Sequence, residues 1–289
     1  MTATGRTIKT SRADIAISET SGKGLPVLLL HGNSSRKEVF ARLMDSAVGE
    51  KFRLIAMDLP GHGASSDARD PARTYTMPGY AEAATELLGE MGIERAAVFG
   101  WSLGGHVAME MIPRFHGLIG LMVSGAPPVG QGAEKVMAGF KPNPHAGLVG
   151  KPDLTAEEKE ILIYATYGGP VDALLRDAVT RTDGRARAVM FESLLTGTTS
   201  DQRALVENTD IPIAIVNGAD DPLVNLDYVG GLAYRSLWDN HCFVLRGAAH
   251  APFLQATDTF NAIFSRFMSE MQKRADQPRH SKQSKIVAA

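Results

Sequence analysis

Cysteine is nearly absent from this sequence. Cys242 is the single cysteine in 289 residues, which excludes an internal disulfide and a structural zinc site built from cysteine ligands. The metal-binding patterns H-E-x-x-H and H-x-H-x-D-H do not occur, and neither does a P-loop or a dinucleotide-binding G-x-G-x-x-G after the first buried-strand pattern. We therefore expect no metal ion and no organic cofactor.

Long apolar runs and an excess of either charge are also missing. No run approaches the roughly 18 apolar residues of a membrane-spanning helix, and residues 1–20 lack the apolar core of a signal peptide. The formal net charge at pH 7 is −2, so no overall field favours nucleic acid. These absences predict a cytoplasmic protein with neither nucleic acid nor a membrane as a partner, and they leave the oligomeric state open.

The sequence does contain a regular alternation of strand-like and helix-like segments. Six short apolar runs have the pattern of strands buried on both faces, at 27–33, 52–61, 96–101, 118–127, 212–221 and 241–250. Helix-length segments lie between or after these runs, at about 36–47, 78–91, 103–114, 224–237 and 257–272. The alternation predicts an α/β fold with a mostly parallel sheet flanked by helices. The early segments TIKTSR and DIAISET predict an antiparallel hairpin at one edge of that sheet.

One interval breaks the alternation, and the end of the chain differs in composition. Residues 129–207 contain helical patterns joined by glycine and proline turns but no convincing buried strand. We therefore assign 1–128 and 208–272 to a core domain, and 129–207 to a helical cap over the carboxyl edge of the sheet, where ligands bind in such folds. Residues 273–289 are basic and poor in apolar side chains, which predicts a disordered tail.

The segment FGWSLGG contains the pattern G-x-S-x-G with Ser102 at its centre. It closes one predicted strand and opens one predicted helix, which is the setting of a nucleophile elbow. Gly100 and Gly104 leave room for the sharp turn that this setting requires. Ser102 is therefore the predicted nucleophile, and the backbone N–H groups of Leu103 and Asn33 are the predicted donors of an oxyanion hole.

A nucleophilic serine needs a base and an acid that orients the base. His250 follows the last predicted strand and is third in the chain order serine, acid, histidine, so it is the predicted base. The preceding strand ends in VNGADDP, from which we predict Asp221 as the acid and keep Asp220 as the alternative. His106 lies four residues after Ser102, from where it cannot easily reach the hydroxyl, so we interpret it as a packed or solvated helix residue.

The motifs HGNSS, DLPGHGASSD, FGWSLGGH, VNGADDP and GAAHAPF, in this order, resemble the α/β-hydrolase superfamily across most of the chain. The segments GAPPV, RTDGRAR, MFE and PIAIVNG extend a resemblance to the α/β-hydrolase-type N-acyl-homoserine lactonases through the predicted cap. This resemblance implies the α/β-hydrolase fold and a metal-independent lactonase. It also implies a triad and two oxyanion donors, namely Ser102, Asp221, His250, Asn33 and Leu103.

In that family a tyrosine of the cap contacts the lactone. The segment ILIYATYGG offers Tyr164, which is our first choice, and Tyr167 as the alternative. An apolar cap would hold the acyl chain of the substrate. The further residues predicted to contact the substrate are Trp101, Met137, Phe140, Met190 and Phe191.

Together these features predict a serine hydrolase that opens the lactone ring of a small-molecule N-acyl-homoserine lactone through an acyl-enzyme. General carboxylesterases and C–C bond hydrolases share every predicted catalytic residue, so they are the alternatives among enzymes. A hydrolase-fold ligand receptor is the alternative outside enzymes, because such a receptor can keep an intact triad.

Overall fold

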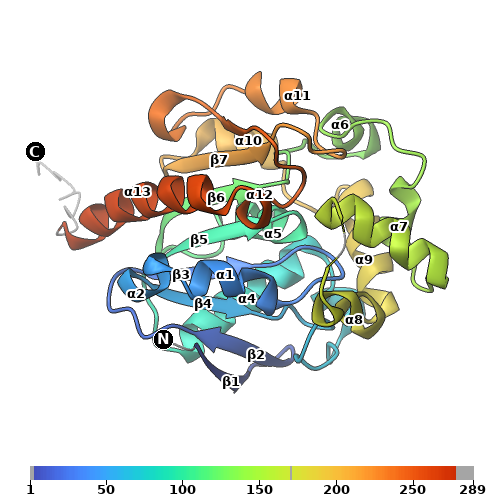
Figure 1. The fold of residues 1–289 in the computed structure, drawn as a ribbon, viewed down its shortest axis with the longest axis horizontal. Helices are drawn as coiled ribbons and strands as arrows, with labels where there is room; N and C mark the ends of the chain where they lie inside the picture. Colours follow the sequence, from blue (N-terminus) through green and yellow to red (C-terminus); the bar gives the residue numbers. More distant parts are fainter. Residues whose placement is uncertain (1–2, 170, 278–289) are drawn as a thin grey trace, which may run out of the picture.

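The structure is a computed structural model that describes residues 3–169 and 171–277. In these ranges eight strands form one sheet in the order β1-β2-β4-β3-β5-β6-β7-β8 (Figure 1). β2 pairs antiparallel with β1 and with β4, whereas the pairs from β4 to β8 are parallel. The predicted parallel sheet with an antiparallel edge hairpin is thus confirmed. The strands span Thr4–Lys9, Asp14–Glu19, Pro26–Leu30, Arg53–Met57, Ala96–Trp101, Leu118–Ser124, Ile213–Gly218 and Phe243–Leu245.

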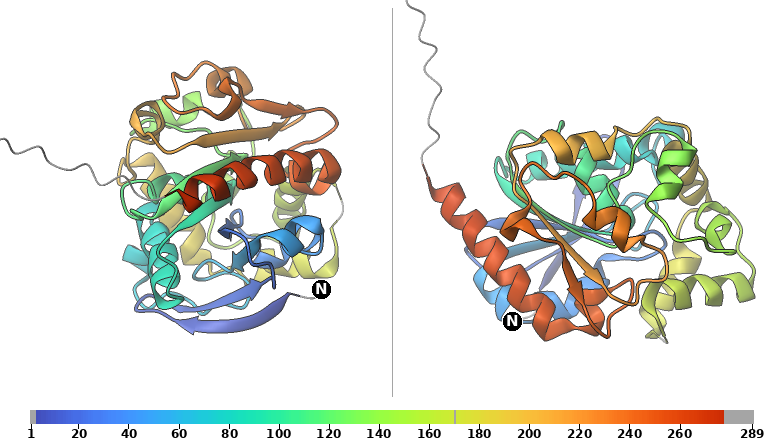
Figure 2. Two further views of the ribbon diagram at one scale, coloured as in Figure 1. Left: turned by 90° about the vertical axis from the view of Figure 1, so that its left-hand side faces the viewer. Right: turned by 90° about the horizontal axis from the view of Figure 1, so that it is seen from above.

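Helices cover both faces of the sheet, which explains why the parallel strands from β3 to β7 are apolar at nearly every position. Successive side chains of a strand point to opposite faces. Val27 and Leu29 of β3 accordingly pack with one group of helices, and Leu28 and Leu30 pack with another. The first group includes α1 (Ala41–Met44), α2 (Ala47–Lys51), α12 (Pro252–Gln255) and α13 (Thr257–Asp276), and α13 runs along its side of the sheet in Figures 1 and 2. The second includes α4 (Met77–Glu90) and α5 (Leu103–Glu110).

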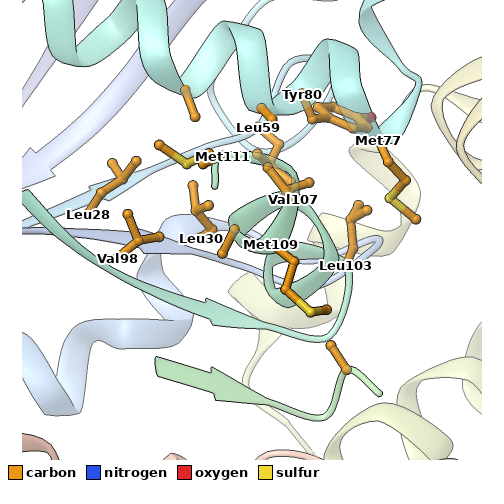
Figure 3. Close-up of a cluster of buried hydrophobic side chains, with 14 of the residues drawn as sticks. Leu28, Leu30, Leu59, Met77, Tyr80, Val98, Leu103, Val107, Met109 and Met111 are labelled. Atoms are coloured by element: carbon orange, nitrogen blue, oxygen red, sulfur yellow. The ribbon is translucent and has the colours of Figure 1, made fainter. Parts of the chain in front are cut away.

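The packing of α5 against the sheet determines where its N-terminus lies. Figure 3 shows Leu30 of β3 and Val98 of β5 close to Val107 of α5, with Tyr80 of α4 beyond them. All four side chains are fully buried. Burial of large apolar side chains is worth about 1.5–3 kcal/mol each, so this layer holds α5 firmly against the carboxyl ends of β3 and β5.

The described residues between β6 and β7 form helices and add no strand to the sheet. They include α6 (Ala133–Ala138), a 3₁₀ turn η2 (Ala146–Gly150), α7 (Ala156–Tyr167), α8 (Ala173–Arg181), α9 (Gly184–Leu195) and α10 (Gln202–Asn208). A capping box stabilises the N-terminus of α7: the Thr155 side chain accepts the Glu158 N–H, and the Glu158 side chain accepts the Thr155 N–H. α7, α8 and α9 gather at one end of the sheet (Figure 1), whereas α10 packs against α5. The boundaries 129–207 of the cap stay a prediction.

Three predicted helices are shorter than expected. The segment 103–114 is helical only as far as Glu110, the last residue of α5. The segment 36–47 divides into a 3₁₀ turn η1 (Lys37–Phe40) and α1, and α2 starts afresh because the Ser46 side chain caps it by accepting the Val48 N–H. The segment 224–237 contains only the short helix α11 (Leu226–Gly230), followed by Gly231. Two adjacent glycines favour helix termination, because glycine is among the weakest helix formers. The short helix α3 (Pro71–Thr74) and the 3₁₀ turn η3 (Trp238–Asn240) complete the described helices.

The last helix is longer than predicted. α13 continues to Asp276 because Phe264, Phe267 and Met271 recur on its buried face and hold it against the sheet. Residues 273–276 are therefore helical, which corrects the prediction of disorder there. Residues 278–289 of the predicted tail lie outside the described residues. In the described part of the chain, no helix combines the length and the apolar character needed to cross a membrane.

Candidate active site

Ser102 stands at the sharp turn between β5 and α5. Its backbone dihedrals are φ 55° and ψ −121°, a conformation that costs free energy in a non-glycine residue and persists only where the surroundings impose it. Its N–H donates to the carbonyl oxygen of Ser124 at 2.8 Å, and its own carbonyl accepts the N–H of Gly105 at 2.8 Å. These bonds join the turn to β6 on one side and to the first turn of α5 on the other.

The glycines around Ser102 are required by close backbone contacts. A Cβ atom on Gly100 would lie 2.1 Å from the carbonyl oxygen of Gly104, and one on Gly104 would lie 2.0 Å from the carbonyl oxygen of Leu30. No real side chain fits at such distances. The G-x-S-x-G pattern thus lets the start of α5 approach the end of β3, as the sequence predicted.

His250 and Asp221 form the central polar pair of the site. The Nδ1–H of His250 donates to Oδ2 of Asp221 at 2.9 Å, and both side chains are almost completely buried. Oδ1 of Asp221 accepts the backbone N–H groups of Leu223 at 2.8 Å and Val224 at 3.1 Å. Since Nδ1 carries the proton, Nε2 of His250 is left with a lone pair that can accept a proton.

Opposing effects act on the pKa of Asp221. Burial raises it, whereas the charge and hydrogen bond of His250, with the N–H groups of Leu223 and Val224, lower it. The net result is a pKa below the ordinary value of a carboxyl group. Asp221 is therefore an ionised acceptor suited to hold the imidazole and to stabilise its protonated form.

Asp220, the alternative acid, has a different environment. It is exposed, and it lines an outer groove away from Ser102. Its backbone N–H donates to the carbonyl oxygen of Ala248 at 2.9 Å, which directs the loop so that the next residue turns inward. The structure therefore brings Asp221, and not Asp220, to His250.

Trp101 holds His250 in position and Gly125 leaves room for its ring, and the sequence analysis missed both roles. Trp101 Nε1–H donates to the carbonyl oxygen of His250 at 2.7 Å. Gly125, after β6, has φ +67°, and a Cβ there would lie 2.8 Å from Cε1 of His250. Trp101 was predicted to contact the substrate, but it is completely buried and lines neither cavity at Ser102. This is a correction: the large apolar indole fills space behind the site.

The loop after β3 lies directly against Ser102. A Cβ on Gly32 would be only 3.1 Å from Cβ of Ser102. His31 shapes this loop, because its Nδ1–H donates to the Gly32 carbonyl at 2.8 Å and its Nε2 accepts the Leu59 N–H at 3.0 Å. Asn33 follows and donates its side-chain amide to the carbonyl oxygen of Val149 in η2 at 3.0 Å.

The first N–H groups of a helix have no partner within the helix, and Leu103 is the first residue of α5. Asn33 and Leu103 line the same cavity as Ser102. The structure thus brings the two residues predicted to form the oxyanion hole to the same cavity as the serine. Their catalytic role stays a prediction.

A cavity of about 130 Å³ opens on Ser102 and His250. Its walls are mostly apolar and come largely from α6, η2 and α9. The four predicted acyl-chain contacts in this region all line it, namely Met137, Phe140, Met190 and Phe191. A second cavity of about 60 Å³ shares Asn33, Ser102 and His250 with the first and extends toward α7, where it meets Ile161, Leu162, Ala165 and Thr166.

Neither predicted tyrosine lines these two cavities. Tyr164 is 70% exposed and belongs to the outer groove beside Asp220, which corrects its prediction as a lactone contact. The physical reason is the position of each residue around the helix. Leu162 and Ile163 lie on the buried face of α7, so Tyr164, the next residue, lies on the exposed face. Tyr167 is buried, and its hydroxyl donates to Ser35 Oγ at 2.9 Å. Burial raises the pKa of Tyr167 to about 12.

Two cavity residues were missed as functional candidates by the sequence analysis. His106 is packed, as one of the two interpretations had it, but it also lines the larger cavity. Lys141 lines that cavity and donates through Nζ to the backbone carbonyl of Asp221 at 2.6 Å. The i+4 spacing from Ser102 was the only available signal for His106. Among the described residues, no group of three histidine, cysteine, aspartate or glutamate side chains could hold a metal ion.

Comparison with known proteins gives a consistent picture. A model of the alpha/beta hydrolase family matches residues 27–263. The chain is 27% identical over 250 residues to a pimeloyl-[acyl-carrier protein] methyl ester esterase of Neisseria meningitidis, with 84% of this chain and 93% of the relative covered. It is also 27% identical over 261 residues to a 2-hydroxy-6-oxononadienedioate/2-hydroxy-6-oxononatrienedioate hydrolase of Pseudomonas sp., with 84% and 87% covered.

Solved structures of N-acyl homoserine lactonase AidH are more similar. A mutant of that protein complexed with N-hexanoyl homoserine has 44% sequence identity and a TM-score of 0.92, and the match covers 97% of this chain and 100% of the other. A complex with N-butanoyl homoserine has 44% identity and a TM-score of 0.91, with 96% and 100% covered. The predicted fold, with its helix-flanked and mostly parallel sheet, is confirmed by these matches.

Proposed function

The chain belongs to the alpha/beta hydrolase family, and from this premise we propose that it is a serine hydrolase that opens the lactone ring of N-acyl-homoserine lactones. The observation that carries the proposal is the His250–Asp221 pair, whose imidazole lines a mostly apolar cavity together with Ser102. The 44% identity to a lactonase with N-acyl homoserine ligands, over nearly the whole of both chains, supports the choice of substrate.

The reaction begins with attack by Ser102 on the lactone carbonyl carbon. Nε2 of His250 accepts the serine proton as the new C–O bond forms, and the carbonyl oxygen becomes an oxyanion. The ionised Asp221 stabilises the imidazolium that results. The N–H groups of Leu103 and Asn33 donate to the oxyanion, and the N-terminus of α5 adds a favourable field.

Collapse of the tetrahedral intermediate then breaks the ring C–O bond. The imidazolium of His250 returns its proton to the departing oxygen, so the homoserine side chain becomes a free alcohol while the carbonyl stays esterified to Ser102. Water, activated by the same imidazole, hydrolyses this acyl-enzyme and releases N-acyl-homoserine. The larger cavity holds the acyl chain through Met137, Met190 and Phe191, at about 0.8 kcal/mol for each buried methylene.

Mass spectrometry of the product tests the proposal directly. Incubation with N-hexanoyl-homoserine lactone is expected to yield a product that is heavier by one water and keeps its amide. The Ser102→Ala variant, in which Oγ is lost without added bulk, is expected to yield none above the uncatalysed rate. Free hexanoic acid would instead mean amide cleavage, and an unchanged rate in the variant would overturn the serine mechanism.

General esterase or C–C bond hydrolase activity is the second candidate, favoured by the two relatives at 27% identity. Comparison of kcat/KM for N-hexanoyl-homoserine lactone and 4-nitrophenyl hexanoate separates it from the first. A preference of several orders of magnitude for the ester would favour the second candidate. A burst without steady-state turnover on either substrate would instead favour a ligand receptor.

A further inference from the structure

His106 places a polar ring in the mostly apolar wall of the larger cavity. It lies on α5, it is almost completely buried, and it shares the cavity lining with Phe140, whose ring centroid is 6.1 Å away. The proposed mechanism does not use this imidazole. Its hydrogen bonds nevertheless define which of its two nitrogen atoms carries a proton.

The side chain of Gln202 determines that protonation state. Nε2 of Gln202 lies 3.3 Å from Oε1 of Glu110 and 3.4 Å from the carbonyl oxygen of His106, and both of these atoms are acceptors. The amide nitrogen must therefore face them, which directs Oε1 of Gln202 to His106. That oxygen lies 2.7 Å from Nδ1 of His106, so Nδ1 must be the donor.

The other ring nitrogen, Nε2, is consequently an acceptor. It has no hydrogen-bond partner among the described residues. It also keeps some accessible surface, because it is not among the described side-chain atoms that are both unpartnered and inaccessible. Those atoms are His62 Nε2, Tyr80 Oη, Arg95 Nε, Asn261 Oδ1 and Gln272 Oε1. Since His106 lines the cavity, the lone pair of Nε2 is available to a bound molecule there.

We propose that His106 is a specificity-determining residue whose Nε2 accepts a hydrogen bond from a hydroxyl group at carbon 3 of the acyl chain. The assignment rests on the proposed function. Ser102 is the N-cap of α5 and His106 lies four residues later within this helix, which separates them by about 6 Å along its axis. Carbon 3 lies five bonds from the lactone carbonyl carbon, also about 6 Å in an extended chain.

The proposal predicts which substrate is preferred, because a hydrogen-bond acceptor favours a hydroxyl group over a ketone. A 3-hydroxyacyl chain donates to Nε2, an unsubstituted chain leaves Nε2 without a new bond, and a 3-oxo chain brings a second lone pair against it. Burial lowers the pKa of His106 to about 4, so the ring stays neutral near pH 7. A net hydrogen bond of ordinary strength corresponds to about a 3- to 10-fold preference.

The test compares kcat/KM for N-hexanoyl-, N-(3-hydroxyhexanoyl)- and N-(3-oxohexanoyl)-homoserine lactone. The expected order is hydroxy first, unsubstituted second and oxo third, with the hydroxy substrate about 3- to 10-fold above the unsubstituted one. His106→Phe, which keeps an aromatic ring without an acceptor, is expected to bring the hydroxy-to-unsubstituted ratio to about 1. His241→Phe is the matched control, because His241 is exposed and lines neither cavity, and it is expected to keep the wild-type ratio.

Two further measurements cover the case in which His106→Phe does not fold. Gln202→Leu removes the acceptor for Nδ1, so it is expected to reduce the hydroxy-to-oxo ratio. The ¹⁵N NMR spectrum of the wild type is expected to show a protonated Nδ1 and an unprotonated Nε2 in His106. Equal kcat/KM for the three lactones, or a protonated Nε2, would overturn the proposal while the lactonase function stands. No turnover of any lactone would overturn both.

Discussion

Nδ1 of His250 lies 2.9 Å from Oδ2 of Asp221, whereas the neighbouring carboxylate of Asp220 is exposed in an outer groove. Two adjacent aspartates thus have opposite environments. The Asp221 carboxylate satisfies both of its oxygens inside the protein, one through the imidazole and the other through backbone N–H groups. This relationship decides which of the two residues orients the base.

The first prediction follows from this difference. Asp221→Asn is expected to lower kcat on the order of 10³- to 10⁴-fold, because an amide no longer holds the required tautomer of His250 or stabilises its protonated form. Asp220→Asn is the matched control and is expected to change kcat by less than about twofold. Steady-state kinetics on one lactone measures both variants, and equal losses in the two would contradict the assignment.

The second prediction concerns the backbone contact of α5 with β3. Gly104→Ala is expected to destabilise the fold by at least about 2 kcal/mol, since the new Cβ would lie 2.0 Å from the carbonyl oxygen of Leu30. Gly89→Ala lies in helix α4, where nothing is within 4 Å of the new methyl group. It is expected to stabilise by about 0.5–1 kcal/mol. Urea unfolding followed by circular dichroism measures both changes, and similar values would contradict the close approach.

A third prediction tests Trp101 as a positioning residue. Trp101→Phe removes the bond from Nε1 to the His250 carbonyl, so we expect kcat to fall about 10-fold while KM changes little, because the indole does not line the cavity. Trp238 also donates through Nε1, to Glu270 at 2.8 Å, and it lines neither cavity at Ser102. Trp238→Phe is thus a control expected to keep kcat. A rise in KM with unchanged kcat in Trp101→Phe would instead indicate direct substrate contact.

The fourth prediction is the pH dependence of stability. Burial lowers the pKa of His106 to about 4 in the folded protein from its ordinary value of 6.5. The unfolded chain therefore binds more protons between about pH 6.5 and pH 4, and the free energy of unfolding decreases as the pH falls through this window. His106 alone would account for a loss of about 3 kcal/mol at the acid end.

Urea unfolding of the wild type and His106→Phe at a series of pH values measures this contribution. Burial also lowers the pKa of His31 and His62, so the variant is expected to keep part of the acid destabilisation. The expected result is that the wild-type free energy of unfolding falls more steeply than that of the variant below about pH 6.5. Parallel curves would contradict a neutral, buried His106.

Several features could be predicted from the sequence because they depend on residues that are near in the chain. Alternating apolar runs and helix-length segments indicated the parallel sheet, since strands buried on both faces must be apolar throughout. The turn at Ser102 was predictable because Gly100 and Gly104 leave space that no other residue allows. Chain order then pointed to His250.

Other features depend on side-chain direction after folding. Tyr164 lies on the exposed face of α7 and Tyr167 on its buried face. No local sequence pattern indicated which of the two tyrosines would be exposed. The bond from Trp101 to His250 joins residues 149 positions apart, so nothing near Trp101 in the sequence could indicate it. The same is true of the contact between Gly125 and His250.

The sequence by itself determined the succession of strands and helices, the elbow at Ser102 and the residue types of the site. These follow from backbone sterics and from the periodicity of apolar side chains, which act over a few residues. The tertiary structure alone decided between Asp221 and Asp220, and it alone placed the proton of His106 on Nδ1 through Gln202. Both outcomes depend on which hydrogen-bond partner lies within about 3 Å, and only the packed fold brings distant segments that close.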